Sequence, residues 1–571
     1  MTAPGPTRPS LSRRGLFAAA GTIAVITLVA RVVGFGRWFV FSHSVGATCV
    51  GSVYQSVNAV PNVLFEIAAG GVLAAVAVPL VAGALARGDR DHADGTASAL
   101  LTWAAAVLVP LGLLVALAAR PIAGALLGTG CAGEVALGAE LLRIFAIQIP
   151  LYGIAIVMAG VLQAHHRFVG AALAPLLSSI VVIATYLAYR SLALHPAAEI
   201  DAVPHSALVV LGVGTTLGVV ALALPLVVPV RRAGVRLRPR LHFPDGVGGR
   251  VRLLAASGLV AVAGQQVATL VVIRLANDRG GAGTLNVYTY AQAVTLLPYA
   301  VLAVPLATAA FPSLAGAHAA GDGAVADPSA RPGQEAGEDL AAATLRRAWL
   351  ATLVVTLLGA ATLVAVAIPV GVFFSALDAG ADSDASLETL ATMGDAVTLF
   401  APSVVALGVI GLLSRASYVR GSPLVAGGLA AAGWLGTVVL PLVALDTSGA
   451  GGPATLRALA GGSSLGLAAG AALLVALVGR TWGWHALSLP ARPLLAALVG
   501  SVAGAIAGRG LASWLSIHGV GQSAGSSVAV GLGVGVVALL VMVGLTVAID
   551  PSVLARVRRR RRDPDTADAV A

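Results

Sequence analysis

The chain contains little charge and no lysine. Only 11% of its 571 residues are charged, whereas 58% are hydrophobic; soluble domains carry about 25% charged residues. Together with a mean hydropathy of +0.93, this composition excludes a cytosolic enzyme and a disordered chain, and it indicates an integral membrane protein. All 35 basic residues are arginine, which together with the many Ala and Gly residues is typical of a high-GC bacterial genome.

Other features are also scarce. Two cysteines exclude a disulfide scaffold and a multi-cysteine metal site. The sequence has no Walker loop, no H-E-x-x-H and no G-x-S-x-G set on a strand-turn-helix, so we expect no enzyme and no cofactor. Without an ATPase motif, a transporter would draw on an ion gradient or the membrane potential. The net charge of +10 comes from short arginine clusters between apolar runs, which argues against a nucleic-acid partner.

Apolar runs fill nearly the whole chain. A helix needs about 20 apolar residues to cross the hydrocarbon layer, and we predict about fourteen spans in an all-α membrane fold. The predicted spans are residues 15–42, 50–85, 97–119, 137–164, 168–190, 206–230, 252–275, 284–313, 347–375, 390–414, 422–445, 454–479, 491–514 and 525–549. The connection at about 316–345, rich in Ala, Gly, Asp and Glu, is expected to be disordered.

The arginines predict the orientation. Clusters at 8–14, 231–252 and 556–562 alternate with connections that are poor in Arg and contain Asp and Glu. By the positive-inside rule, both termini of this multi-pass chain lie in the cytoplasm, in the plasma (inner) membrane of a bacterium. Cys49 and Cys131 then lie on the oxidising side, where both a disulfide and two free thiols are open alternatives.

An internal repeat predicts the domain organisation. The pattern P-x-x-A-G-A-x-A-x-G-D begins at Pro79 and again at Pro312, 233 residues later; chance similarity is the alternative, because Ala and Gly are so common here. The offset corresponds to an even number of spans, so the halves would be parallel repeats with the substrate between them. We predict a cytoplasmic tail at 1–14, an N-lobe at 15–240, a C-lobe at 241–485, two extra spans at 486–550 and a basic cytoplasmic tail at 551–571, which would bind anionic lipids.

Three charged residues are predicted to lie deep in the membrane. They are Arg31 and Arg37 in the first span and Glu66 in the second, and such residues usually face a cavity or a partner. Gly34 and Gly36 could bend the helix, so that both guanidiniums reach one anion-binding cavity. In the alternative, Glu66 neutralises one arginine and fixes the bundle. The other charges lie near outer span ends, where snorkelling to headgroups is expected: Glu140, Arg143, Arg274 and Asp395.

Several motifs resemble the MurJ/MviN-type lipid II flippase family, within the multidrug, oligosaccharidyl-lipid and polysaccharide exporter superfamily. The resemblance spans about residues 15–480. It rests on Gly21-Thr22, Ala30-Arg31-Val32-Val33-Gly34-Phe35-Gly36-Arg37, Val45-Gly46-Ala47, Val60-Pro61-Asn62, Gly70-Gly71 and Val78-Pro79, and further on Gln163 to Phe168, Ala174-Pro175, Tyr290-Ala291, Leu297-Pro298 and Phe311 to Leu314.

This resemblance implies two six-helix lobes in a V around a cationic cavity, with two final helices forming a groove for a polyprenyl tail. Arg31 and Arg37 match the family arginines that are implicated in gripping the diphosphate and sugar headgroup. Asn62 and Glu66 are expected to shape that substrate site. The implied partner is a lipid-linked peptidoglycan precursor, and cell-wall synthesis proteins are further candidates.

The sequence departs from the family pattern and is identified as a divergent, actinobacterial-like member. Trp38 and Ser52 replace expected acidic residues, while Phe65 and Ala293 replace expected cavity arginines. A later motif is shortened to Arg415-x-x-Tyr418-x-Arg420-Gly421-Ser422-Pro423. The resemblance therefore predicts a lipid II flippase that works by alternating access. Alternatives are an exporter of another polyprenyl-linked glycan or of a drug, and a non-transporting scaffold in cell-wall synthesis.

Overall fold

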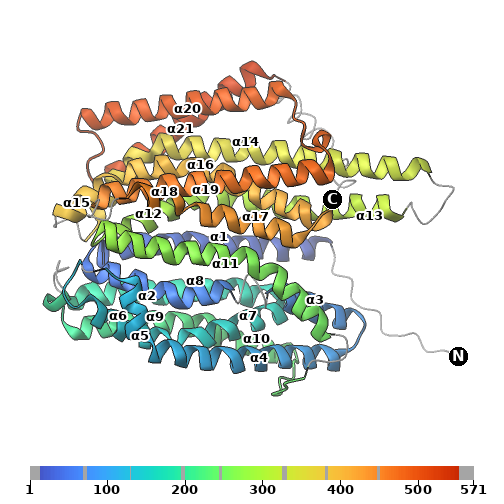
Figure 1. Cartoon of the computed structure of the whole chain (residues 1–571), viewed down its shortest axis with the longest axis horizontal. Coiled ribbons are helices and arrows are strands. Elements are labelled where there is room, and N and C mark those ends of the chain that lie inside the picture. The colour runs from blue at the N-terminus through green and yellow to red at the C-terminus, as the bar shows by residue number, and fades with distance from the viewer. Residues whose placement is uncertain are drawn as a thin grey trace.

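A computed structural model describes residues 13–67, 74–128, 130–193, 200–242, 247–323, 331–379, 384–445 and 451–551 (Figure 1). Within these ranges every regular element is helical, as predicted. Most of the two predicted tails, residues 1–12 and 552–571, lies outside the described residues.

The helices of the first half are α1 (Arg13–Ser44), α2 (Cys49–Glu66), α3 (Ala74–Ala86), α4 (Arg90–Leu117), α5 (Ala119–Leu126), α6 (Glu134–Phe145), α7 (Gln148–Ala164), α8 (Phe168–Ala193), α9 (His205–Ala223) and α10 (Val227–Arg232). Those that follow are α11 (Val247–Gly280), α12 (Thr284–Pro298), α13 (Val304–Gly323), α14 (Arg331–Leu377), α15 (Asp384–Ala391), α16 (Met393–Val419), α17 (Pro423–Gly436), α18 (Val439–Ala444), α19 (Gly451–Trp482), α20 (Ala491–Ile517) and α21 (Ala524–Ile549).

Most of the predicted spans coincide with long apolar helices. The described residues contain 12 helical stretches that are long and apolar enough to cross a membrane. The other two predicted spans fall on α11, and on α2 with α3. The predicted span 50–85 is not one described helix, because α2 ends at Glu66 and α3 begins at Ala74.

The helices form two bundles side by side (Figure 1). In the first, α8 packs on α1 and α9, and α4 packs on α7; in the second, α16 lies between α14 and α19. The last two helices, α20 and α21, pack on each other and on α14. They therefore extend the second bundle and do not lie between the two.

Glycines allow the backbones of α17 and α19 to touch. A Cβ atom added to Gly466 would lie 2.2 Å from the backbone nitrogen of Thr437, and one added to Gly433 would lie 2.9 Å from the Cα of Gly470. Small residues permit this close approach in helices that have no hydrophobic driving force to associate in lipid. The glycines at these positions thus serve helix packing.

The connection between the halves is held along α4. Backbone N–H groups of Arg236, Arg238 and Arg240 donate to side-chain oxygens of Asp94, Ser98 and Thr102, at 3.1, 3.0 and 3.0 Å. The donors are two residues apart in an extended segment, and the acceptors are four apart on one helix face. This match of spacings satisfies the backbone donors and leaves the arginine side chains exposed.

The expected disordered connection at 316–345 is largely helical. α13 continues to Gly323 and α14 begins at Arg331, so only residues 324–330 of this stretch lie outside the described residues. The prediction was wrong because Ala and Glu, which are common in this segment, are good helix formers.

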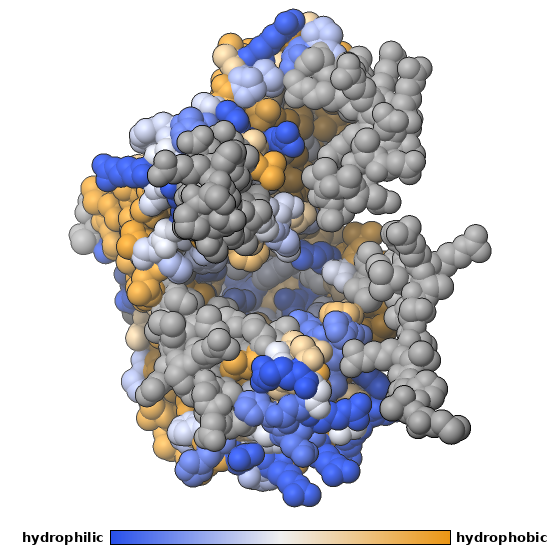
Figure 2. Space-filling view, turned by 90° about the vertical axis from the view of Figure 1, so that its right-hand side faces the viewer, coloured by the Kyte–Doolittle hydropathy of each residue, from blue (hydrophilic) through white to orange (hydrophobic). Residues whose placement is uncertain are grey.

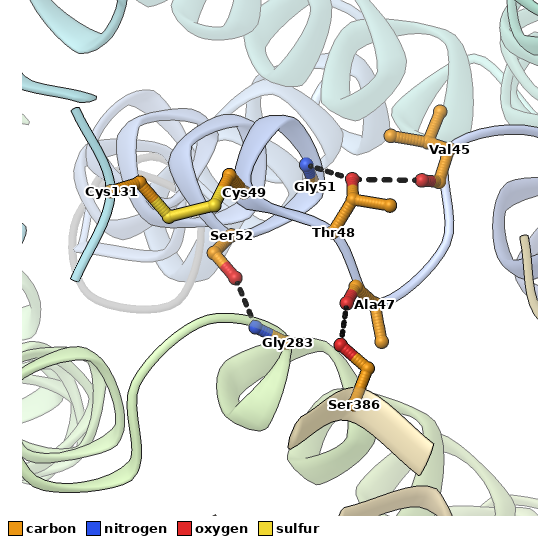
Figure 3. Close-up of a disulfide and its surroundings, with 9 residues drawn as sticks. All are labelled: Val45, Ala47, Thr48, Cys49, Gly51, Ser52, Cys131, Gly283 and Ser386. Atoms are coloured by element: carbon orange, nitrogen blue, oxygen red, sulfur yellow. Dashed lines mark hydrogen bonds between the residues drawn. A yellow bond between two sulfur atoms is a disulfide. The ribbon is translucent and has the colours of Figure 1, made fainter. Parts of the chain in front are cut away.

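Cys49 and Cys131 form a disulfide (Figure 3). Cys49 is the first residue of α2, where the Thr48 side chain caps the helix by accepting from the backbone nitrogen of Gly51 at 3.1 Å. Cys131 lies in the connection between α5 and α6, with its Cα 6.2 Å from that of Cys49. The bond ties the start of α2 to this connection within one half of the molecule.

We expect Cys49→Ser to lower the free energy of unfolding by about 2–4 kcal/mol, because the disulfide closes a long loop in the unfolded chain. Thermal unfolding of the detergent-solubilised protein, with and without reductant, measures this effect. Reductant should lower the stability of the parent protein to that of the variant and leave Cys49→Ser unchanged. Equal stability of the oxidised parent and the variant would contradict the prediction.

Candidate functional site

A buried carboxylate joins the two halves at one end of the molecule. Asp378, which follows α14, is 6% exposed. It accepts hydrogen bonds from the Ser42 hydroxyl at 2.6 Å and from the backbone nitrogen of Ala47 at 2.6 Å. Both donors belong to the end of α1 and the turn after it, in the other half. A buried carboxylate needs such donors, so it favours contact between the halves here.

Further hydrogen bonds cross at the same end (Figure 3). The Ser386 hydroxyl donates to the Ala47 carbonyl at 2.7 Å, and the backbone nitrogen of Gly283 donates to the Ser52 hydroxyl at 2.7 Å. Gly283 has φ +81°, and a Cβ atom there would lie 2.6 Å from the Ala47 carbonyl oxygen. Only glycine suits both this backbone conformation and this close approach.

The loop after α5 completes this contact, which we call the closed end. Asn277 on α11 donates its amide to the Ser56 hydroxyl at 2.7 Å and to the Leu126 carbonyl at 2.9 Å. Arg274, one turn earlier, donates to the Leu127 carbonyl. The sequence predicts that Arg274 snorkels to lipid headgroups, but its guanidinium also binds the opposite half.

Two other charged residues near the closed end have protein partners. Glu140 lies 3.5 Å from His205, and Asp395 lies 3.0 Å from Arg457 and 3.9 Å from Arg509. These are exposed pairs, which contribute little stability. They fit the expectation that such charges sit at span ends.

The opposite end is open. Figure 2 faces this end and shows a surface hollowed between the two halves, with hydrophilic side chains inside the hollow and apolar side chains on the flanks. Two helical lobes that meet at one end and part at the other can expose a central site to one side of a membrane.

A polar cavity of about 310 Å³ lies between the halves. From α2 it is lined by Gln55, Asn58, Asn62 and Glu66, and its opposite wall includes Gln265, Gln266, Thr269, Tyr288, Gln292, Trp434, Thr437 and Ser463. Glu66 is an ionisable residue in this lining, and such residues within spans usually face a cavity or a partner. This lining is mainly neutral and rich in amides.

A second cavity of about 280 Å³ lies within the first half and is lined by the same face of α2. Arg37 lines it together with Tyr152 and Tyr186, and Asn62 and Glu66 line both cavities. The Tyr152 hydroxyl donates to the amide oxygen of Asn62 at 3.2 Å. The polar face of α2 thus connects the arginine to the space between the halves.

The structure brings three of the four predicted site residues together. Arg37, Asn62 and Glu66 share the cavity in the first half, whereas Arg31 is exposed and lines neither cavity. The helix α1 runs without a break through Gly34 and Gly36, so the two arginines keep the roughly 120° separation of a regular helix. Glu66 forms no ion pair with any described residue.

Sequence reasoning missed Gln55 and Asn58. With Asn62 and Glu66 they follow at intervals of three and four residues, which places all of them on one face of α2. This spacing of polar residues within an apolar span is enough to predict a polar helix face from the sequence alone. Gln55 Nε2 and Asn58 Oδ1 are buried without a hydrogen-bond partner among the described residues, so both atoms are available to a ligand.

An apolar groove of about 590 Å³ lies beside α1. It is lined by Phe35 and Phe39 of α1 and by residues of α12, α14 and α21, including Pro298, Phe373, Val528, Gly531 and Leu532. The two phenylalanines flank Arg37 in sequence but lie on the opposite side of the helix, at the same depth. The groove therefore offers a hydrocarbon-like surface level with the arginine.

No group of three or more His, Cys, Asp or Glu residues among the described ranges is arranged to hold a metal ion.

Two helical lobes, closed at one end around a polar cavity, define the class of this chain as a two-lobed, all-helical protein with many apolar helices that are long enough to cross a membrane. Residues 41–518 match the family described as lipid II flippase MurJ. The chain belongs to this family.

Individual proteins agree with this assignment. A probable lipid II flippase MurJ of Rhizobium meliloti (strain 1021) is 27% identical over 304 residues, which are 52% of this chain and 54% of that protein. The chain thus spans about half the length of this curated relative. A solved lipid II flippase MurJ in an inward closed conformation has a TM-score of 0.68 at 16% identity, covering 93% of this chain and 99% of that one. An inward-facing multidrug resistance MATE family transporter of the MOP superfamily has a TM-score of 0.57 at 15% identity, covering 80% and 98%. At these identities the solved structures show the shared fold.

We expect Asp378→Asn to loosen the closed end, because the amide offers one acceptor oxygen where the carboxylate offers two charged ones. Hydrogen bonds to charged groups contribute about 1.5–3 kcal/mol, so the population that is open at this end should rise at least about tenfold. Spin labels on cysteines introduced at the exposed residues Ser191 and Leu387, one in each half, report the separation by electron–electron resonance.

The native cysteines are disulfide-bonded, so the labels attach only at the introduced sites. Glu388→Gln, which removes an exposed carboxylate at the same end, is the matched control and should leave the distance distribution unchanged. An unchanged distribution for Asp378→Asn would show that the carboxylate does not hold this end closed.

Proposed function

We propose that this chain is a flippase for lipid II, which it moves from the inner to the outer leaflet of the plasma membrane by alternating access. The observation that carries the proposal is the position of Arg37. This arginine faces a cavity that adjoins the space between two lobes, and those lobes are sealed at one end by cross-lobe hydrogen bonds and hollowed at the other.

The open end is proposed to face the cytoplasm, with both termini on that side. Described arginines near this end or in its connections are Arg87, Arg90, Arg167, Arg231, Arg232, Arg236, Arg238, Arg240, Arg346, Arg347, Arg420, Arg480 and Arg492. The closed end contains fewer arginines, among them Arg190, Arg274, Arg279, Arg457 and Arg509, and they lie near the acidic residues Asp278, Asp378, Glu388 and Asp395. This asymmetry follows the positive-inside rule.

The site residues would have different roles. Arg37 would bind the diphosphate through its planar guanidinium, which remains charged at any physiological pH. Asn62 and Glu66, with the unpartnered amide atoms of Gln55 and Asn58, would bind hydroxyl and amide groups of the headgroup. Arg31 lies six residues earlier, roughly 9 Å nearer the open end along α1, where its exposed guanidinium would attract the anionic headgroup on entry.

The polyprenyl tail would remain in the apolar groove while the headgroup crosses. The groove lies level with Arg37, so a diphosphate bound there would keep its tail in a hydrocarbon-like environment. Part of the groove wall comes from α21, one of the two helices added after the N-lobe (15–240) and the C-lobe (241–485). These two helices would thus guide the tail, and the basic segment 551–571 would bind anionic lipids of the inner leaflet.

Complementation tests the proposal directly. In a cell depleted of its own flippase, expression of this chain should restore growth and the exposure of labelled lipid II at the outer leaflet. An inserted, well-expressed chain that restores neither would contradict the proposal and would favour another lipid-linked glycan or a scaffold role in cell-wall synthesis.

In the same cells, Arg37→Gln should reduce lipid II exposure at least tenfold, because about 1.5–3 kcal/mol of charge-assisted binding is lost. Arg37→Lys should restore part of the activity, since it returns the charge without the bidentate geometry. Arg31→Gln should have a weaker effect, mainly at low substrate supply. If Arg31→Gln were as severe as Arg37→Gln, the division into entry and binding roles would be wrong.

A bulky residue at Gly531 should block the tail. Gly531→Trp would fill the groove between α14 and α21, where even a Cβ atom lies 3.6 Å from Pro369. Gly533→Trp on the same helix is the matched control, because a Cβ there meets nothing within 4 Å. Lipid II exposure should be lost with Gly531→Trp and kept with Gly533→Trp, at equal membrane insertion.

A further inference from the structure

A large cavity inside the second half contains an arginine that the proposed mechanism does not use. It measures about 710 Å³ and lies among α11, α12, α13, α16 and α17. Its polar lining includes Gln265, Tyr299, Ser414, Arg415 and Tyr418. Arg415 is half-buried and carries the only guanidinium in this lining.

Arg415 and Tyr299 converge on one point of the wall. The Arg415 guanidinium donates from NH1 to the carbonyl of Gly411 at 2.7 Å. A Cβ atom placed on Gly411 would lie 3.5 Å from the Tyr299 hydroxyl and 3.7 Å from the same guanidinium nitrogen. The Tyr299 hydroxyl and the Arg415 guanidinium thus lie close together beside Gly411. The other four N–H groups of the guanidinium remain for a ligand.

This cavity corresponds to the Arg37 cavity in the repeat that the sequence predicts. The Arg37 cavity involves α1, α2, α7, α8 and α9, which belong to the first, second, fourth, fifth and sixth predicted spans. The Arg415 cavity involves α11, α12, α16 and α17, which belong to the seventh, eighth, tenth and eleventh. The two cavities thus involve four pairs of corresponding spans, and each is lined by one arginine and by tyrosines, although Arg37 lies on the first span and Arg415 on the tenth.

Both arginine cavities adjoin the cavity between the halves. That central cavity shares Asn62 and Glu66 with the Arg37 cavity, and it shares Gln265 and Trp434 with the Arg415 cavity. A long headgroup could thus contact both arginines at once. Because the apolar groove is level with Arg37, the end of the ligand that carries the tail belongs near Arg37, and the distal end belongs near Arg415.

We propose that Arg415 and Tyr299 form a second anion site, which binds a carboxylate of the substrate's peptide while Arg37 binds the diphosphate. This inference rests on the proposed function. Lipid II carries its diphosphate next to the polyprenyl chain and its peptide carboxylates at the far end of the headgroup. An arginine with an adjacent hydroxyl suits a carboxylate, because the guanidinium fork can bind both oxygens.

Binding of defined ligands to the purified full-length protein tests this inference. Native mass spectrometry would measure affinity for lipid II, for lipid II with its peptide carboxylates amidated, and for undecaprenyl diphosphate. The parent protein should bind lipid II about tenfold more tightly than the amidated form. Arg415→Gln should lower the affinity for lipid II to that of the amidated form, and leave the other two ligands unchanged.

The controls separate this site from the rest. Arg415→Lys should retain part of the preference, Tyr299→Phe should reduce it, and Arg480→Gln, an exposed arginine near the same end, should have no effect. If Arg415→Gln lost affinity equally for all three ligands, Arg415 would have a structural role. If the variant lost affinity for none of them, Arg415 would bind no part of the ligand. If Arg415 bound the diphosphate and not a carboxylate, Arg415→Gln would bind undecaprenyl diphosphate more weakly than the parent protein. Each of these three outcomes overturns the inference.

The proposed function has its own readout in this experiment. It fails if the parent protein binds neither lipid II nor undecaprenyl diphosphate, or if Arg37→Gln leaves the affinity for undecaprenyl diphosphate unchanged. The inference about Arg415 is tested by a different comparison, the affinity for lipid II against the affinity for its amidated form. Both of these ligands carry the diphosphate, so this comparison does not depend on how the diphosphate binds.

Discussion

Satisfying one buried carboxylate requires both halves of the protein. Asp378 belongs to the second bundle, yet its donors include the Ser42 hydroxyl and the Ala47 backbone, which belong to the first. A carboxylate removed from water without such donors costs several kcal/mol. The halves can therefore separate at this end only if water or other donors replace these contacts. This requirement keeps the closed end shut, and the shape of the cavity and the accessibility of Arg37 from the opposite end depend on it.

The membrane spans are predictable from the sequence because the hydrocarbon layer requires each spanning segment, by itself, to be a long apolar helix. Apolar runs predict the helices, and the sequence positions of Asn62 and Glu66 alone indicate a polar face within a span. Asp378 cannot be recognised in this way. It lies 331 residues from Ala47, and its role exists only through that long-range contact. Arg31 and Arg37 show the intermediate case, since helix geometry already indicates that they share a face only loosely, and continuity of α1 keeps Arg31 out of the cavities.

The departures from the family pattern change the character of the cavity. Phe65 and Ala293 stand where the resemblance leads us to expect arginines, and the space between the lobes is lined mainly by amides and hydroxyls. A neutral polar lining costs less free energy to desolvate than a cationic one. It suits sugars and peptide groups through the directional geometry of hydrogen bonds more than through charge. Fewer fixed charges also mean weaker long-range attraction of an anion. Under the proposed function, selectivity in this chain would thus depend on a small number of charged contacts set among many neutral ones.

The disulfide has a consequence for biogenesis. Both cysteines belong to the first half, with a separation of 82 residues, so the bond can form before α11 and all later helices have been synthesised. A covalently closed N-terminal bundle would then present Ser52 and the Leu126 carbonyl as a finished docking surface for helices that are still leaving the ribosome. Because the bond never bridges the two halves, it would also persist unchanged through every cycle of opening and closing, as a permanent part of one moving body.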